Sequence, residues 1–303
     1  MMEPASRQGR IAVLGAGTMG AQIAQQAALH GYDVVLHDLS GDQLERALRS
    51  NRGHLDRRVA KGEFGRAEAD DALARVRPEP DLGTAVRAAA MVVEAVAEQL
   101  PTKQALFREV ERHAPSDAIV ASNSSTMTIS EIAGDLATRE RALALHFFNP
   151  ALVMRLVEIA PAPFTDPACV ETARQFCLAI DRDPVVLRKE IAGLLVNRVL
   201  WALRREAMWL ADNGYAEPQE IDRAVTLGLN HPMGPFRLAD FNGLDVVLAA
   251  QRHRFETSGQ EADRPSALLE RLVADGDLGR KSGRGFYDHQ APEGRAGNGD
   301  ETR

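Results

Sequence analysis

The chain has 303 residues, of which 45% are hydrophobic and 26% are charged, as in an ordinary soluble globular protein. This length exceeds the roughly 100–200 residues of one typical domain, so we expect two domains. The formal net charge of −7 argues against broad binding to nucleic acid, which needs a basic surface.

The two cysteines, Cys169 and Cys177, match neither a zinc-site spacing nor a disulfide framework. They predict free thiols in a reducing compartment. The sequence shows neither a secretory leader nor an apolar run of about 18 residues, the length that a membrane helix needs. We therefore expect a cytoplasmic protein with no membrane span, no nucleic-acid partner and no bound metal.

Strand and helix patterns alternate in the first part of the chain. Short apolar runs predict strands at residues 10–14, 33–37, 90–95, 118–122, 142–146, 153–159 and 184–187. Helical patterns fall between them: one ends near residue 30, and others span about 41–61 (with a break at Gly53), 103–113, 129–136 and 169–180. Residues 71–75 look like a connection. This alternation predicts an α/β fold over residues 1–189, a Rossmann-type doubly wound and mostly parallel sheet.

The pattern changes near residue 190. Helical spacing of apolar residues continues at about 194–214, 218–228, 235–257 and 265–275, without a further strand pattern. We expect an all-helical C-terminal domain over residues 190–288. The remaining residues, 289–303, are polar and rich in glycine, which predicts a disordered tail.

A glycine-rich segment directly follows the first predicted strand and opens the first helix. Gly15 permits a tight turn, Gly17 lets the backbone approach a pyrophosphate, and Gly20 lets helix and strand pack closely. The helix N-terminus, with Thr18 and Met19, offers N–H groups to the diphosphate. Asp38, at the end of the second strand, can accept hydrogen bonds from ribose hydroxyls and would repel a 2′-phosphate. The fingerprint therefore predicts NAD rather than NADP.

A serine, a histidine and a glutamate follow later strands. Ser125 ends a Ser-Asn-Ser-Ser run, His146 opens His-Phe-Phe-Asn-Pro, and Glu158 lies twelve residues after His146. Histidine is the usual general base near neutral pH, and a carboxylate can both orient it and stabilise its protonated form. Twelve residues through an Asn-Pro turn can bring Glu158 back to His146, so we expect these two side chains to pair.

Over residues 9–288 the sequence resembles the 3-hydroxyacyl-CoA dehydrogenase family. The motifs above come in the order of that family, together with Glu94 to Glu98, Val196-Asn197-Arg198, His231 to Pro235 and Gly283 to Tyr287. The resemblance implies NAD-dependent oxidation of a (3S)-3-hydroxyacyl thioester, such as 3-hydroxybutyryl-CoA, to the 3-oxoacyl thioester, and the reverse reaction. It also implies a role in fatty acid metabolism and a homodimer.

The resemblance also assigns roles to residues. His146 becomes the base and Glu158 its partner, Ser125 binds the substrate oxygen, and Asn197 binds substrate from the helical domain. Further cofactor contacts are implied for Glu98, Lys103, Asn149 and Lys281. The basic residues Arg57, Arg58 and Lys61 share one predicted helix, with Arg57 and Lys61 on one face, where the family places lysines that meet coenzyme A phosphates.

Three departures from the family pattern border the substrate. Lys189 to Leu194 replaces an Asp-x-x-Gly-Phe approach to the asparagine, Ala151-Leu152 follows the Asn-Pro pair, and Ser124 replaces a common threonine. These changes leave open an acyl group carried by acyl carrier protein instead of coenzyme A.

Two other protein classes fit this sequence less well. Dehydrogenases of the 6-phosphogluconate type need a Gly-x-x-x-Lys helix, which this chain lacks around Asn197. A non-catalytic NAD-binding or structural relative would be expected to have lost His146, Glu158 or Ser125, and all three are present.

Overall fold

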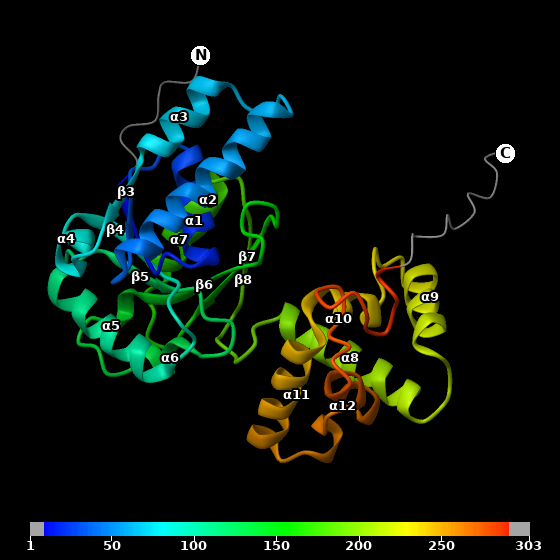
Figure 1. The fold of residues 1–303 in the computed structure, drawn as a ribbon. Coiled ribbons are helices and arrows are strands. Elements are labelled where there is room, and N and C mark those ends of the chain that lie inside the picture. Colours follow the sequence, from blue (N-terminus) through cyan, green and yellow to red (C-terminus); the bar gives the residue numbers. More distant parts are fainter. Residues whose placement is uncertain (1–8, 291–303) are drawn as a thin grey trace, which may run out of the picture. The chain divides into compact units, whose positions relative to one another are not determined.

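The structure is a computed structural model, described here for residues 9–290, and it divides into two compact units between Leu195 and Val196 (Figure 1). The division lies a few residues beyond the boundary expected at residue 190. Among the described residues, no helix combines the length and the apolar character that a membrane span requires.

The first unit is built on one eight-stranded sheet with the order β3-β2-β1-β4-β5-β6-β7-β8. Neighbouring strands are parallel except β6 and β7, so β7 and β8 run opposite to the other six strands. This is the doubly wound Rossmann arrangement that the sequence predicts, extended by two strands. The strands are β1 (Arg10–Leu14), β2 (Val34–His37), β3 (Val76–Glu79), β4 (Ala89–Glu94), β5 (Ile119–Ser122), β6 (Ala142–Phe147), β7 (Leu156–Pro161) and β8 (Asp183–Val186).

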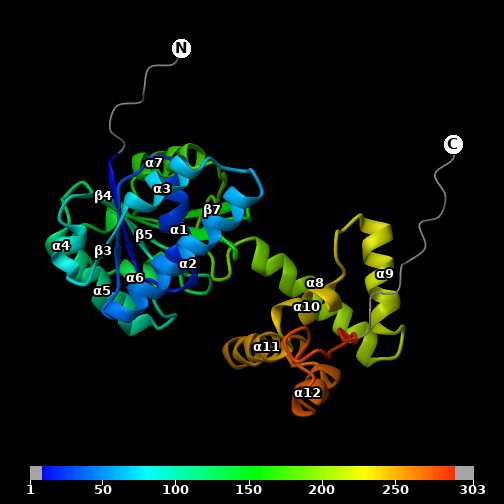
Figure 2. The same cartoon turned by 45° about the horizontal axis from the view of Figure 1, so that its top comes forward.

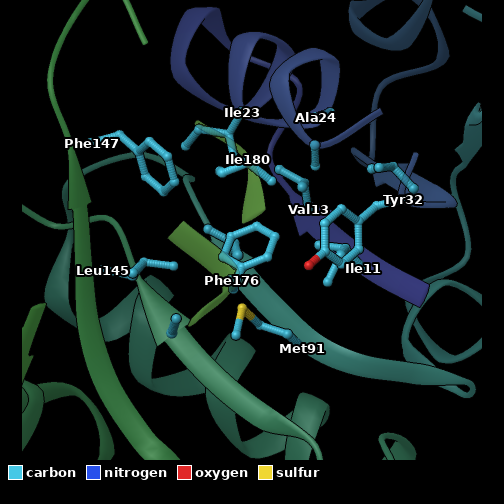
Figure 3. Close-up of a cluster of buried hydrophobic side chains, with 14 of the residues drawn as sticks. Ile11, Val13, Ile23, Ala24, Tyr32, Met91, Leu145, Phe147, Phe176 and Ile180 are labelled. Carbon is cyan, nitrogen blue, oxygen red and sulfur yellow. The ribbon is translucent and has the colours of Figure 1, made fainter. Parts of the chain in front are cut away.

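Helices cover both faces of this sheet (Figure 1). They are α1 (Thr18–Leu29), α2 (Gly41–Ala60), α3 (Arg66–Ala74), α4 (Leu82–Val86), α5 (Leu100–His113), α6 (Ile129–Ala133) and α7 (Pro167–Ala179), with a 3-10 turn at Arg139–Arg141. Because side chains alternate along a strand, Ile11 and Val13 join the core under α1, α2 and α7 (Figure 3). Ala12 and Leu14 join the core under α4, α5 and α6. Burial on both faces explains why the central strands are continuous apolar runs.

Several element predictions for this unit are wrong. Helix α2 runs through Gly53 without a break, because a glycine inside a helix lowers its stability without ending it. Residues 71–75 belong mostly to α3 instead of a connection. Strand β7 begins at Leu156, after a turn at 151–153, rather than at Val153. Strand β3 and helix α4 were not predicted.

The second unit consists mainly of helices (Figure 2). Residues 235–257 form two helices instead of the one predicted, because Gly243 between them adopts a φ of +91°. Buried side chains on five segments form its core: Met208, Phe236, Leu248, Leu269 and Phe286. The helices are α8 (Val196–Asp212), α9 (Pro218–Leu229), α10 (Pro235–Asn242), α11 (Leu244–Ser258) and α12 (Ala267–Ala274), with a 3-10 turn at Glu261–Asp263.

Two buried aspartates of this unit hold the segments that follow residues 231–234 and 283–285. Asp222 accepts hydrogen bonds from the N–H groups of Phe236 and Arg237, at the start of α10. Asp240 accepts from the N–H groups of Phe286 and Tyr287 and bonds the ring of His289. The segments His231 to Pro235 and Gly283 to Tyr287, which the sequence shares with the family, therefore stabilise the helical unit. The tail predicted from residue 289 is ordered as far as this contact, and residues 291–303 lie outside the described part of the chain.

Candidate active site

The glycine-rich loop connects β1 to α1 at the carboxyl edge of the sheet. A Cβ at Gly15, whose φ is +100°, would lie 2.6 Å from the carbonyl oxygen of Ala95. A Cβ at Gly20 would lie 1.8 Å from the carbonyl oxygen of Gly15. By contrast, nothing lies within 4 Å of the Cβ position at Gly17, so its backbone is open to a ligand. The loop thus has the form of a diphosphate cradle at a helix N-terminus.

Two side chains hold this loop in place. Asp38 Oδ2 accepts a hydrogen bond from the N–H of Ala16 at 2.9 Å. Gln43, in the first turn of α2, donates to the carbonyl oxygen of Ala16 at 2.8 Å. Asp38 therefore fixes the loop, and its predicted contact with a ribose stays a prediction. Sequence reasoning missed Gln43, because no local pattern reveals a contact across 27 residues.

A cavity of about 650 Å³ opens beside the loop. It is lined mainly by the segments that follow β1, β2 and β4 and by α5, and it includes Gly17, Asp38, the exposed Leu39, Val96 and Leu106. An acidic group, an apolar wall and a glycine cradle fit the adenosine half of NAD.

The His146 and Glu158 side chains face each other across β6 and β7. The two residues are directly opposed in the antiparallel register, which places their side chains on one face of the sheet. His146 Nδ1 lies 3.0 Å from Glu158 Oε2, and both side chains are buried. Because a carboxylate can only accept, Nδ1 carries the hydrogen and Nε2 is left to take up a proton. The predicted pair is therefore present with the geometry of a general base and its orienting partner.

Further contacts hold the pair. Glu158 Oε1 accepts a hydrogen bond from the N–H of Leu195 at 2.9 Å. The rings of His146 and Phe148 meet edge to face at 4.6 Å. Asn123 Oδ1 accepts from the N–H of Phe147 at 2.8 Å, which joins the ends of β5 and β6. The histidine is consequently fixed from its own strand, from β7 and from the loop after β5.

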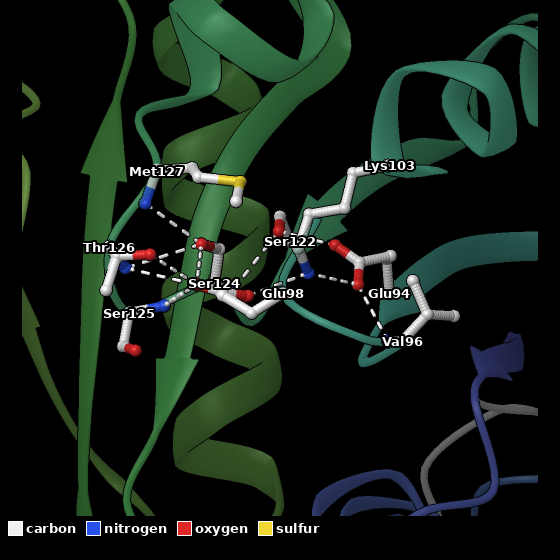
Figure 4. Close-up of polar contacts among 9 residues, drawn as sticks. All are labelled: Glu94, Val96, Glu98, Lys103, Ser122, Ser124, Ser125, Thr126 and Met127. Atoms are coloured by element: carbon white, nitrogen blue, oxygen red, sulfur yellow. Dashed lines mark hydrogen bonds and ion pairs between the residues drawn. The ribbon is translucent and has the colours of Figure 1, made fainter. Parts of the chain in front are cut away.

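A network of charged side chains joins α5 to the ends of β4 and β5 (Figure 4). Lys103, on α5, is only 1% exposed and forms ion pairs with Glu94 at 2.6 Å and Glu98 at 3.1 Å. Glu94 Oε2 also accepts from the hydroxyl of Ser122 at 2.6 Å. Sequence reasoning gave Glu94 and Ser122 no role. A charged residue that ends the otherwise apolar strand 89–94 was the available signal, since a buried charge requires a partner.

The loop after β5 carries Ser125 and is bonded to Glu98. Glu98 Oε1 accepts from the hydroxyl of Ser124, from the hydroxyl of Thr126 at 2.8 Å, and from the N–H groups of Ser125 and Thr126. Burial raises the pKa of Glu98, but the bond from Ser124 and the charge of Lys103 outweigh it and hold the pKa below its usual value. Glu98 and Lys103 do not line the cavity beside the glycine loop, so their predicted cofactor contacts stay predictions.

The other predicted site residues lie in separate places. In the first unit, Arg57 and Lys61 are exposed near the C-terminal end of α2, and Asn149 is exposed after β6. In the second unit, Asn197 lies in the first turn of α8, and Lys281 pairs with Asp245 at 2.6 Å. The structure therefore brings together His146 and Glu158 and builds the loop of Ser125 close by, while the roles of these five residues remain predictions.

Comparison with known proteins places this geometry in a family. The model of the 3-hydroxyacyl-CoA dehydrogenase NAD binding domain matches residues 10–191, and that of the C-terminal domain matches residues 193–289. The chain is 36% identical to a 3-hydroxybutyryl-CoA dehydrogenase of Bradyrhizobium diazoefficiens, over 93% of this chain and 95% of that protein.

Two relatives from Escherichia coli are longer than this chain. The identity to a 3-hydroxyadipyl-CoA dehydrogenase is 38% over 93% of this chain, which spans 59% of that protein. The crystal structure of a 3-hydroxybutyryl-CoA dehydrogenase superposes with a TM-score of 0.89 at 35% identity, covering 97% of this chain and 62% of that one. Since both family models match and together cover nearly all of residues 10–289, the chain belongs to the 3-hydroxyacyl-CoA dehydrogenase family.

Proposed function

We propose that the chain oxidises a (3S)-3-hydroxyacyl thioester to the 3-oxoacyl thioester with NAD, and catalyses the reverse reaction. The observation that carries the proposal is the buried pair of His146 and Glu158 in the NAD-binding unit. The relatives carry the names of 3-hydroxybutyryl-CoA and 3-hydroxyadipyl-CoA dehydrogenases, which share this reaction and differ in the acyl group.

Each predicted site residue has a separate role in this reaction. Bound nicotinamide supplies the hydride acceptor. His146 takes the hydroxyl proton on Nε2 while C3 loses its hydride, which leaves a carbonyl at C3. Glu158 stabilises the imidazolium that forms and keeps Nδ1 protonated. Ser125 holds the substrate oxygen near Nε2, and the glycine loop and Asp38 hold the cofactor.

We propose coenzyme A as the thioester carrier. Arg57, in the last turn of α2, and Lys61, directly after the helix, are exposed one helical turn apart, and the described contacts give neither an ion-pair partner. Two cations in this position suit the phosphates of coenzyme A. Reduction of acetoacetyl-CoA with NADH, followed at the absorbance of the reduced nicotinamide, tests the activity. Turnover with carrier-protein thioesters alone would show that acyl carrier protein, and not coenzyme A, carries the acyl group. No turnover with either thioester would overturn the proposed function.

We also propose a cytoplasmic homodimer that forms through α8. The side chains of Val199 and Trp209 on this helix are 70% and 49% exposed, an apolar surface that a partner would cover. Both cysteines are free, as expected in a reducing compartment. Sedimentation velocity at micromolar concentration should show a dimer, and Val199→Glu should shift it toward the monomer. A monomeric wild-type protein would contradict the dimer.

A further inference from the structure

The loop at residues 122–127 is held by an unusual concentration of bonds on one carboxylate oxygen. Glu98 Oε1 accepts from two hydroxyl groups and two backbone N–H groups of Ser124, Ser125 and Thr126 (Figure 4). Ser124 Oγ in turn accepts from the N–H of Met127 at 3.0 Å. Every residue from Ser124 to Met127 is therefore tied to Glu98 directly or through Ser124.

Further bonds hold the carboxylate of Glu98, which together with Ser124 forms the clamp on this loop. Lys103 pairs with the other oxygen of Glu98 and with Glu94, and Glu94 bonds Ser122. Ser122 Oγ accepts from the N–H of Ser124 at 3.1 Å, which closes the network on the loop. Since Lys103 and Glu94 are fully buried, this base has little freedom to move.

We propose that Glu98 is a positioning residue for substrate, because its carboxylate fixes the loop that presents the Ser125 hydroxyl. The inference rests on the proposed function, in which Ser125 holds the substrate oxygen. This role is additional to the cofactor contact that the resemblance implies for Glu98, because it acts through Ser125. The lowered pKa keeps the carboxylate charged, and its bonds made, throughout the neutral range.

Ser124 allows this role to be separated from a direct contact with ligand. Its side chain is only 3% exposed and donates to Glu98, so it cannot contribute a surface to bound cofactor or substrate. If the clamp positions Ser125, then Ser124→Ala should loosen the loop in the same way as Glu98→Gln. Ser124→Thr keeps the hydroxyl and should restore most of what Ser124→Ala loses.

The first test measures amide hydrogen exchange, which does not depend on activity. Glu98→Gln and Ser124→Ala should both speed exchange at the N–H groups of Ser125 and Thr126, because the charged acceptor or its anchor is lost. Asp117→Asn removes an exposed carboxylate from the turn before β5 and should leave these amides unchanged. Unchanged amide exchange at Ser125 and Thr126 in Glu98→Gln would show that Glu98 does not hold the loop, whether or not the protein turns over any thioester.

The second test separates substrate from cofactor. With NAD saturating, Glu98→Gln should lower kcat/KM for 3-hydroxybutyryl-CoA by about tenfold to a hundredfold, the scale of lost hydrogen bonds to a charged group. Ser124→Ala leaves the carboxylate of Glu98 in place for a cofactor contact, so it should also lower kcat/KM, while the Kd for NADH changes by less than about threefold, within the scatter of such effects. In the Ser125→Ala background, Glu98→Gln should lower kcat/KM little further, because both changes act on the contact between the Ser125 hydroxyl and the substrate.

Two kinetic outcomes overturn the inference. One is weakened NADH binding with kcat/KM for the thioester unchanged, which makes Glu98 a cofactor contact. The other is full additivity with Ser125→Ala, which makes the two residues independent. A wild-type protein that turns over no thioester would instead reject the proposed function, and the exchange result would still decide the clamp.

Discussion

His146 and Glu158 meet as directly opposed residues of two antiparallel strands, with Nδ1 3.0 Å from Oε2. This pairing engages Nδ1 and leaves Nε2 as the ring nitrogen that can take up a proton. His146→Gln should lower kcat for alcohol oxidation by about 10²–10⁴-fold, the usual contribution of general acid–base catalysis. NADH titration should show that the cofactor still binds. An active His146→Gln protein would mean that the proton leaves by another route.

Glu158 should act through His146. Glu158→Gln keeps the shape of the side chain and removes the charge that stabilises the imidazolium, so kcat should fall. The neutral imidazole is then favoured, and the pH profile of oxidation should move to lower pH. Combined with His146→Gln, the second change should have little further effect. Additive losses in the double variant would show that Glu158 has an independent role.

Asp38 should select NAD and stabilise the loop. Asp38→Ala removes both the predicted ribose contact and the acceptor for the N–H of Ala16, so KM for NAD should rise and discrimination against NADP should fall. Asp42→Ala, an exposed carboxylate in the first turn of α2, is the matched control and should change neither. A wild-type preference for NADP would be incompatible with the assignment of Asp38.

The basic end of α2 should matter for coenzyme A substrates. Replacing Arg57 and Lys61 together by glutamate should raise KM for acetoacetyl-CoA and spare kcat, which is the loss of uniform binding. Arg174→Glu with Arg223→Glu makes the same change in net charge at exposed sites elsewhere and should leave KM unchanged. Equal KM values for acetoacetyl-CoA in the two double variants would mean that the basic end of α2 contacts only solvent or a carrier-protein substrate.

Asp240 should hold the second unit together. Its buried carboxylate accepts from Phe286 and Tyr287, and a Cβ at Gly285 would lie 2.3 Å from Oδ1. Asp240→Ala should lower the free energy of unfolding by about 1–3 kcal/mol or more, because two buried N–H groups lose their acceptor. Denaturant unfolding measures this change, with the exposed Asp275→Ala as control. A difference below about 0.5 kcal/mol between the two variants would contradict a structural role.

The sequence predicted elements with strong local patterns and missed those without them. Strands β1 and β4 are apolar runs, because the sheet buries both of their faces. Strand β3, with the sequence Val-Arg-Pro-Glu, pairs only with β2, and an edge strand tolerates charges and proline, so no apolar run marks it. Gly243 lies within an otherwise continuous helical pattern, and only its left-handed conformation divides the helix.

The same distinction applies to the site. The His146–Glu158 pair was predictable, because a hairpin joins the two residues over a short stretch of chain. The Gln43–Ala16 bond and the network of Glu94, Lys103 and Ser122 connect separate elements of the sheet and its helices. Their geometry follows from packing of the whole unit, which no local pattern encodes.

The antiparallel pairing of β6 and β7 also makes the geometry of the His146–Glu158 pair independent of the length of the loop between these strands. The register pairs Leu143 with Pro161 at one end and Phe147 with Val157 at the other, so it places the pair whatever the length of the connection between the strands. A slip of one residue within the ladder would instead turn the carboxylate to the opposite face of the sheet. The alignment of the two strands thus holds the pair, while the connection at residues 148–155 shapes the surroundings of the base through Phe148 and is fixed to the rest of the unit at Ala151, which accepts a hydrogen bond from Arg182.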